Sequence, residues 1–189
     1  MKRLLVLLSA FATLSLPIVS AADKPNILWL TSEDNASHWL GCYGNTQVKT
    51  PTLDSLAKNG IRFKNAYSNA PVCAVARSTI LNGVYAPSQG TQHMRSRYPI
   101  EKKFKPYVHY LREAGYFCTN RSKTDYNFAG NDSAIWDKGR HYSARKDGQP
   151  FFCIFNMTTS HESSLFTTKR SPITYIKPEE VIIPANPLS

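Results

Sequence analysis

The stretch Cys73-Ala74-Val75-Ala76-Arg77-Ser78-Thr79-Ile80-Leu81-Asn82-Gly83 predicts a short helix that begins at a thiol and ends before a glycine. The first turn of a helix carries unpaired N–H groups and a partial positive charge, so an anion can bind there. Arg77, four residues after Cys73, adds a fixed cation. A cysteine in such a field is expected to be a reactive thiol rather than a side chain that only packs in the core.

Around this helix, short apolar runs alternate with helical patterns, which predicts an α/β fold. The expected strands are 26–31, 61–67, 117–119 and 151–157, and the expected helices are 51–59, 73–82 and 105–114. We therefore expect a mostly parallel sheet flanked by helices. Ligands of such sheets gather at the carboxyl ends of the strands. Four chemically useful side chains follow expected strands: Glu33, Asp34, Lys123 and His161.

The first 21 residues match a secretory signal peptide. Lys2 and Arg3 form a basic start, an apolar run covers 4–16, and small residues occupy 19–21. The apolar run is too short to cross a bilayer, which disfavours the alternative of a membrane anchor. We expect an exported protein, periplasmic or extracellular, with no stable membrane anchor after cleavage. Residues 22–189 then contain the functional part, in which 125–148 is expected as a long surface loop and the proline-rich stretch after His161 as extended chain.

The formal net charge is +10, which suits anionic partners. The export signal and the lack of a known binding motif argue against nucleic acid. A sulfated polysaccharide fits better, and the alternative is a merely solvated basic face.

Four cysteines are present, at 42, 73, 118 and 153. Cys118 and Cys153 lie in apolar contexts typical of buried strands, so we expect thiols there, with a Cys118–Cys153 disulfide as the alternative. The chain has no Cys-x-x-Cys pair, so a zinc site is not expected.

The stretch 73–83 resembles the type I sulfatase signature Cys-x-Pro-Ser-Arg-x-x-x-Leu-Thr-Gly at Cys73, Arg77, Leu81 and Gly83, and departs from it at Val75, Ala76 and Asn82. Further segments are similar to that family in the same order: 24–35, 48–57, 61–67, 122–125 and 160–162. The resemblance covers 24–189 and is to bacterial sulfatases of the heparan N-sulfatase type. It implies an alkaline-phosphatase-like fold. Because family members are much longer, it also implies that 22–189 is the N-terminal part of a catalytic domain.

The resemblance also implies roles for single residues. A formylglycine-generating maturation enzyme would oxidise Cys73, and the hydrated product would attack sulfur. Calcium would be held by Glu33, Asp34 and residue 73. Arg77 would stabilise the hydrate and Lys123 would neutralise charge on the sulfuryl group. His161 would help protonate the leaving group or bind sulfate, since histidine titrates in a range that suits this role. Asp125 departs from the family, because many members carry histidine at that position.

A basic loop follows the nucleophile helix, and His93 and Arg95 in it are candidates to line the substrate pocket. The function expected from these residues is hydrolysis of a sulfuric ester, or of a sulfamate, in a sulfated polysaccharide, as in glycosaminoglycan degradation. One alternative is a silent relative that only binds anionic glycan, favoured by Val75 and by the short chain. Another is a phosphoesterase of the same superfamily, disfavoured by Cys73 because that group uses Ser or Thr. Half a sheet also predicts an unpaired edge and aggregation.

Overall fold

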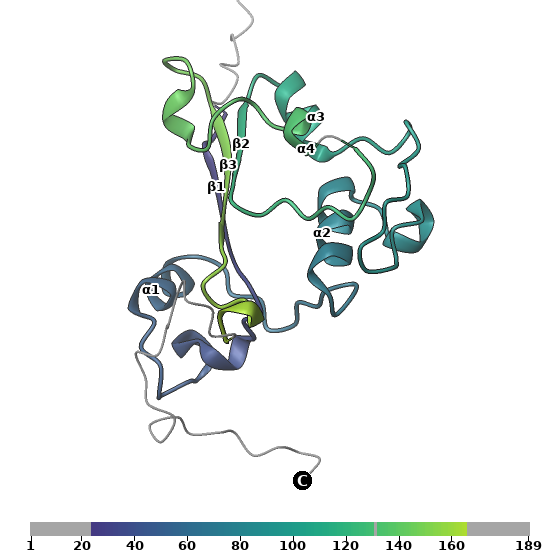
Figure 1. Ribbon diagram of the computed structural model, residues 1–189. Coiled ribbons are helices and arrows are strands. Elements are labelled where there is room, and N and C mark those ends of the chain that lie inside the picture. The colour runs from purple at the N-terminus through teal and green to yellow at the C-terminus, as the bar shows by residue number, and fades with distance from the viewer. Residues whose placement is uncertain (1–23, 131, 166–189) are drawn as a thin grey trace, which may run out of the picture.

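A computed structural model describes residues 24–130 and 132–165 (Figure 1). The expected signal peptide at 1–21 and the expected proline-rich extended tail lie outside these residues, so both stay predictions. Within the described part, β1 (Ile27–Ser32), β2 (Phe117–Arg121) and β3 (Phe151–Met157) form a parallel sheet in the order β1-β3-β2. The predicted α/β class with an open parallel sheet is confirmed.

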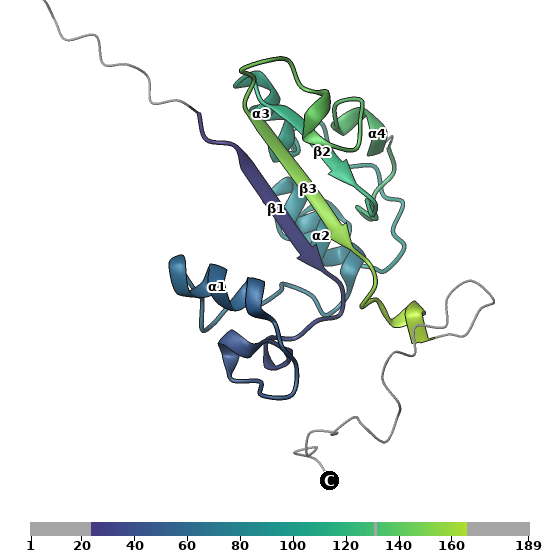
Figure 2. The same cartoon turned by 90° about the vertical axis from the view of Figure 1, so that its left-hand side faces the viewer.

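The central strand is the most apolar one. β3 reads FFCIFNM and pairs with both neighbours, so Phe152 lies between Ile27 of β1 and Cys118 of β2. A central strand, which has a neighbouring strand along each edge, favours such an uninterrupted apolar run. Figure 2 shows the three arrows pointing the same way, which brings their carboxyl ends to one edge of the sheet.

In the part of the chain that the structure describes, four α-helices accompany the sheet: α1 (Pro51–Asn59), α2 (Cys73–Asn82), α3 (Tyr107–Glu113) and α4 (Asp132–Ile135). α2 and α3 lie together against one face, whereas α1 lies beyond the carboxyl end of β1 (Figures 1 and 2). The predicted start and end of α2 are confirmed, because Gly83 follows it with φ 65°, a left-handed conformation that ends helices and favours glycine. Short 3-10 turns connect the elements: Ser37–Trp39, Gly41–Tyr43, Ala86–Gln89, Tyr142–Ala144 and Glu162–Leu165.

The core lies between the sheet and the helices on its covered face. Leu81 of α2 and Val108 of α3 are buried against Phe152 and Ile154 of β3. Other buried members of the same cluster are Tyr116, Cys118, Tyr126 and Trp136. This packing attaches α2 to the sheet and so fixes where Cys73 lies.

Two expectations are wrong. Residues 61–67 do not form a strand, and their apolar side chains are exposed, with Tyr67 at 90%. A strand needs a neighbour to satisfy its backbone N–H and C=O groups, and the sheet of the described residues offers none there. The segment 125–148 is not only a surface loop, because Tyr126 and Trp136 are buried and the Trp136 indole donates a 3.1 Å hydrogen bond to the Tyr126 hydroxyl.

Cys118 and Cys153 are fully buried strand thiols, as expected. Both are free, so the alternative disulfide is absent from the structure. The Thr119 hydroxyl donates to the Cys153 sulfur over 2.9 Å. Burial, with a smaller contribution from Asp137 and opposed by Arg112, raises the pKa of the Cys118 thiol to about 12.

The sheet leaves apolar surface uncovered at β1, an edge strand. Leu28 and Leu30 are each about half exposed. In residues 24–130 and 132–165, no helix is both long and apolar enough to cross a membrane.

Candidate active site

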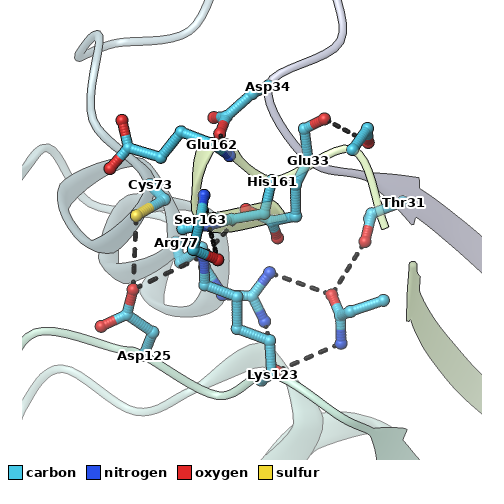
Figure 3. Close-up of polar contacts among 12 residues, drawn as sticks. Thr31, Glu33, Asp34, Cys73, Arg77, Lys123, Asp125, His161, Glu162 and Ser163 are labelled. Carbon is cyan, nitrogen blue, oxygen red and sulfur yellow. Dashed lines mark hydrogen bonds and ion pairs between the residues drawn. The ribbon is translucent and has the colours of Figure 1, made fainter. Parts of the chain in front are cut away.

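The polar residues that follow the three strands meet the N-terminus of α2 at one edge of the sheet (Figure 3). The end of β1 leads into Glu33 and Asp34, the end of β2 into Lys123 and Asp125, and the loop after β3 into 160–163. This convergence follows from the parallel topology, because parallel strands place all their carboxyl ends on the same side.

Cys73 is the first residue of α2, and its sulfur lies 3.4 Å from a carboxylate oxygen of Asp125. The residue before it, Val72, supplies no side-chain cap. The helical hydrogen bonds begin with Ala76 N–H to the Val72 carbonyl, so the preceding N–H groups have no acceptor within the helix. Residue 73 therefore stands where a helix favours an anion.

Arg77 uses two of its nitrogens to hold the loop after β2 and the third to bind β3. Nε donates to the Thr124 carbonyl over 2.6 Å and Nη2 to the Lys123 carbonyl over 2.7 Å. Nη1 donates to the Asn156 side-chain oxygen over 3.0 Å. The guanidinium also lies over the Tyr126 ring, 5.6 Å from its centre. Arg77 thus connects α2 to the loop that carries Lys123.

Lys123 and Glu33 form an ion pair of 2.8 Å, and their side chains are only 14% and 7% exposed. Asp125 lies 3.8 Å from the same ammonium. Burial alone would lower the pKa of Lys123, but the hydrogen bond and the charge of Glu33, helped by Cys73 and Asp125, raise it overall. The ammonium is therefore held charged, next to the first turn of α2.

Asp34 and His161 lie at the same edge of the sheet with other partners. Asp34 has φ 44°, and its carboxylate accepts a 2.8 Å hydrogen bond from the Glu162 N–H. The Ser160 hydroxyl donates to the Glu33 carbonyl. The His161 ring lies 2.8 Å from the Ser163 hydroxyl rather than on Cys73 or Lys123. The loop after β3 is therefore joined to the end of β1, while the role of His161 stays a prediction.

The loop 91–97 is brought to the site through Asn127, a buried residue with φ 62°. The Asn127 amide donates 2.7 Å hydrogen bonds to the carbonyls of Thr91 and His93. Arg95 extends from this loop to Asp125 over 3.2 Å and remains 73% exposed. The structure therefore places Arg95 beside the site. The His93 side chain is exposed, and its role in lining a substrate pocket stays a prediction.

Glu33 and Asp34 supply carboxylate oxygens, which hard cations prefer, but two side chains are too few to fill a calcium coordination sphere. Calcium takes six to eight oxygens, and the described part of the chain contains no cluster of three or more His, Cys, Asp or Glu side chains that would hold a metal. The Glu33 carboxylate faces Lys123. Glu33 and Asp34 are oxygen donors of the kind that calcium prefers, and their role as ligands stays a prediction.

Sequence reasoning missed Asn156 and Asn127. Asn156 is a buried amide inside the apolar run of β3. A buried polar residue in an otherwise apolar strand must find hydrogen-bond partners, and that was the available signal.

An open parallel sheet, with the N-terminus of α2 at the carboxyl ends of its strands, defines the class of fold. A protein solved in complex with its substrate D-glucosamine-2-N,6-O-disulfate superposes with a TM-score of 0.62 and 20% identity, over 74% of this chain and 35% of its own. This likeness shows an alkaline-phosphatase-like fold.

The family model named Sulfatase matches residues 25–133, and the chain belongs to the sulfatase family. An ulvan-active sulfatase of Formosa agariphila is 40% identical over 159 residues, which are 76% of this chain and 26% of that protein. An N-acetylglucosamine-6-O-sulfatase of Bacteroides thetaiotaomicron is 30% identical over 115 residues, 58% of this chain and 20% of its own length. The chain thus spans about a quarter or less of these relatives.

Proposed function

We propose that this chain belongs to an exported enzyme that hydrolyses sulfate esters, or sulfamates, of a sulfated polysaccharide. The observation that carries the proposal is the convergence of Cys73 at the uncapped start of α2 with the paired ammonium of Lys123. Family membership and the relatives that act on sulfated sugars support the substrate class. Export would follow from the signal peptide expected at 1–21, and residues 22–189 would be the N-terminal part of the catalytic domain.

The chain's own residues account for anion binding. The first N–H groups of α2 point a partial positive charge at an anion next to residue 73. Lys123 would neutralise the charge that develops on the sulfuryl oxygens, and its raised pKa keeps it protonated for that role. Arg77 would hold this geometry, since its guanidinium already binds the carbonyls of Lys123 and Thr124.

Two groups would complete the chemistry. Residue 73, converted to formylglycine by a maturation enzyme, would supply a hydroxyl of its hydrate as nucleophile. Calcium, held by Glu33, Asp34 and residue 73 together with oxygens from elsewhere, would acidify that hydroxyl and polarise the sulfate. His161 would give a proton to the leaving group or bind sulfate. His93 and Arg95 would contact the sugar from the loop 91–97.

The second candidate is a protein that binds anionic glycan without turnover. The closed Glu33–Lys123 pair favours it, because the carboxylate expected to hold calcium already has a cation as partner. Val75, in place of the proline of the family signature, also favours it, because the maturation enzyme reads that position.

The test is to produce the chain together with a formylglycine-generating enzyme and to measure two things. Mass spectrometry of the peptide that contains residue 73 reports conversion. Release of inorganic sulfate from ulvan, and from D-glucosamine-2-N,6-O-disulfate, reports hydrolysis. Conversion with sulfate release, both lost in Cys73→Ala, supports the enzyme. Saturable ulvan binding that Lys123→Met weakens, with no sulfate release, supports the silent binder and overturns hydrolysis by this chain.

A further inference from the structure

We infer that Asn156 is a positioning residue of this site: one buried amide holds both Arg77 and the turn that carries Lys123. Asn156 lies near the carboxyl end of β3, the central strand, and is 4% exposed. Its position there gives its side chain access to both neighbouring strands.

The two ends of the amide have different partners. The oxygen of Asn156 accepts hydrogen bonds from Arg77 Nη1 over 3.0 Å and from the Thr31 hydroxyl over 2.8 Å. The nitrogen donates to the Asn120 side-chain oxygen over 2.9 Å and to the Arg121 and Lys123 carbonyls over 2.9 and 3.1 Å. One amide therefore joins β1, β2, the loop after β2 and the nucleophile helix.

The chemistry of these partners fixes the orientation of the amide. A guanidinium only donates and a carbonyl only accepts, so a flipped amide would face donor with donor and acceptor with acceptor. Asparagine therefore fits this position because it presents an acceptor on one side and a donor on the other. Aspartate offers acceptors on both sides, and leucine offers neither.

The Lys123 carbonyl is the point where these contacts meet. It accepts from Asn156, from Arg77 Nη2 and from the Asn120 amide. Arg77 approaches the same carbonyl from α2, so its guanidinium and the Lys123 backbone are held relative to each other. Because the Lys123 ammonium extends from this backbone to Glu33, a shift of the amide would move the ammonium relative to Cys73.

The role of Asn156 deepens the proposed function. It rests on that function in one respect, namely that the anion bound at this site is sulfate. Removing Asn156 would leave Arg77 and the Lys123 turn without their shared partner, so the Lys123 ammonium would no longer be held in a fixed place relative to the first turn of α2. Holding the Lys123 ammonium in place before an anion arrives should raise the affinity for that anion, in addition to any effect on folding.

The experiment compares three variants with the parent chain, using inorganic sulfate as the probe. Asn156→Asp keeps the acceptor for Arg77 and loses the donors to the turn. Asn156→Leu loses both. Thr31→Val is the matched control, because it removes a hydrogen bond to the same Asn156 oxygen without touching Arg77 or Lys123. Isothermal titration measures sulfate affinity, and amide hydrogen exchange by mass spectrometry measures opening of 121–124.

The expected result is exchange about tenfold faster at 121–124 in both Asn156 variants, the order that the loss of hydrogen bonds gives. Sulfate affinity should fall about tenfold in both, while Thr31→Val should leave it unchanged. Unchanged exchange at 121–124 in Asn156→Asp, or an equal loss of sulfate affinity in Thr31→Val, would overturn the inference.

The exchange measurement separates this inference from the proposed function. If the parent chain does not bind sulfate, the proposed anion site fails, and exchange at 121–124 alone decides whether Asn156 holds the turn. If Asn156→Leu does not fold, Asn156→Asp decides, because aspartate has the shape of asparagine and keeps the Arg77 contact.

Discussion

The Lys123 ammonium lies 2.8 Å from the Glu33 carboxylate and so joins the loops that follow β1 and β2. Both side chains are largely buried, which makes this pair different from the exposed Lys103–Glu101 pair. Removing one partner of a buried pair leaves the other charge uncompensated, whereas exposed pairs contribute little. The pair is therefore an element of stability that also fixes the Lys123 ammonium at the carboxyl ends of the strands.

Glu33→Gln should lower the free energy of unfolding by about 2 kcal/mol, because it leaves the largely buried Lys123 ammonium with only the more distant Asp125 carboxylate, 3.8 Å away, as counter-charge. Urea unfolding measures it. Glu101→Gln is the matched control and should stay within about 0.5 kcal/mol. Equal effects of the two substitutions would show that burial of the Lys123 pair is not what matters.

The same pair predicts a pH dependence. The pKa of Lys123 is raised in the folded protein, so its stabilising contribution is complete below the unfolded value, near 10.4, and is lost as pH rises through the folded value. The stability difference between the parent chain and Glu33→Gln should therefore be constant around pH 8 and shrink above about pH 10.5. Urea unfolding at several pH values checks this, and a difference that grows with pH contradicts it.

Arg77→Lys should lower the free energy of unfolding by about 2 kcal/mol or more, because an ammonium cannot reproduce three donors in a fixed fork. Arg97→Lys, on the exposed loop, should change it by less than about 0.5 kcal/mol. Urea unfolding of both variants provides the comparison. If Arg77→Lys is as stable as the parent chain, the hydrogen bonds from Arg77 to the carbonyls of 123 and 124 do not stabilise the fold.

Val75→Pro should be tolerated and should raise conversion of Cys73. Val75 is the third residue of α2, ahead of the first helical hydrogen bond, and proline is accepted in the first turn. Co-production with the maturation enzyme, followed by mass spectrometry of the peptide containing residue 73, measures the converted fraction. Val75→Ala controls for loss of the valine. Equal conversion of parent and Val75→Pro would show that valine does not block the enzyme.

The four thiols should divide into two classes. Cys118 and Cys153 are fully buried, and the raised pKa of Cys118 keeps it a thiol at ordinary pH, so both should resist alkylation. Cys42 and Cys73 are partly exposed and should react with iodoacetamide at pH 8. Peptide mapping counts the modified sites, and urea-unfolded chain, in which all four should react, is the control. Rapid native labelling of Cys118 would contradict its burial.

Phe63→Ser should reduce self-association with little loss of stability, because Phe63 is 66% exposed in the segment that fails to form a strand. Phe152→Ser removes a core ring instead and should cost about 3–5 kcal/mol. Sedimentation velocity and urea unfolding distinguish the two effects. Unchanged association in Phe63→Ser would show that another surface, such as that of β1, is responsible.

Local sequence was enough to place α2, its closing glycine and the strands at 27–32 and 151–157. A run such as FFCIFNM and a thiol before a helical stretch depend on neighbours in the chain, so their structure is decided within a few residues. The order of the motifs was also enough for the family, which the match over 25–133 confirmed.

Only the tertiary structure decided which side chains meet. The failure of 61–67 as a strand, the burial of Tyr126 and the pairing of Lys123 with Glu33 depend on partners far away in the chain. Asn156 shows the reason most clearly, because its five hydrogen-bond partners come from two neighbouring strands, the loop after β2 and a helix. A sequence pattern encodes which face of an element is apolar, whereas hydrogen bonds between residues 35 and 125 positions apart exist only once the sheet has brought those ends together.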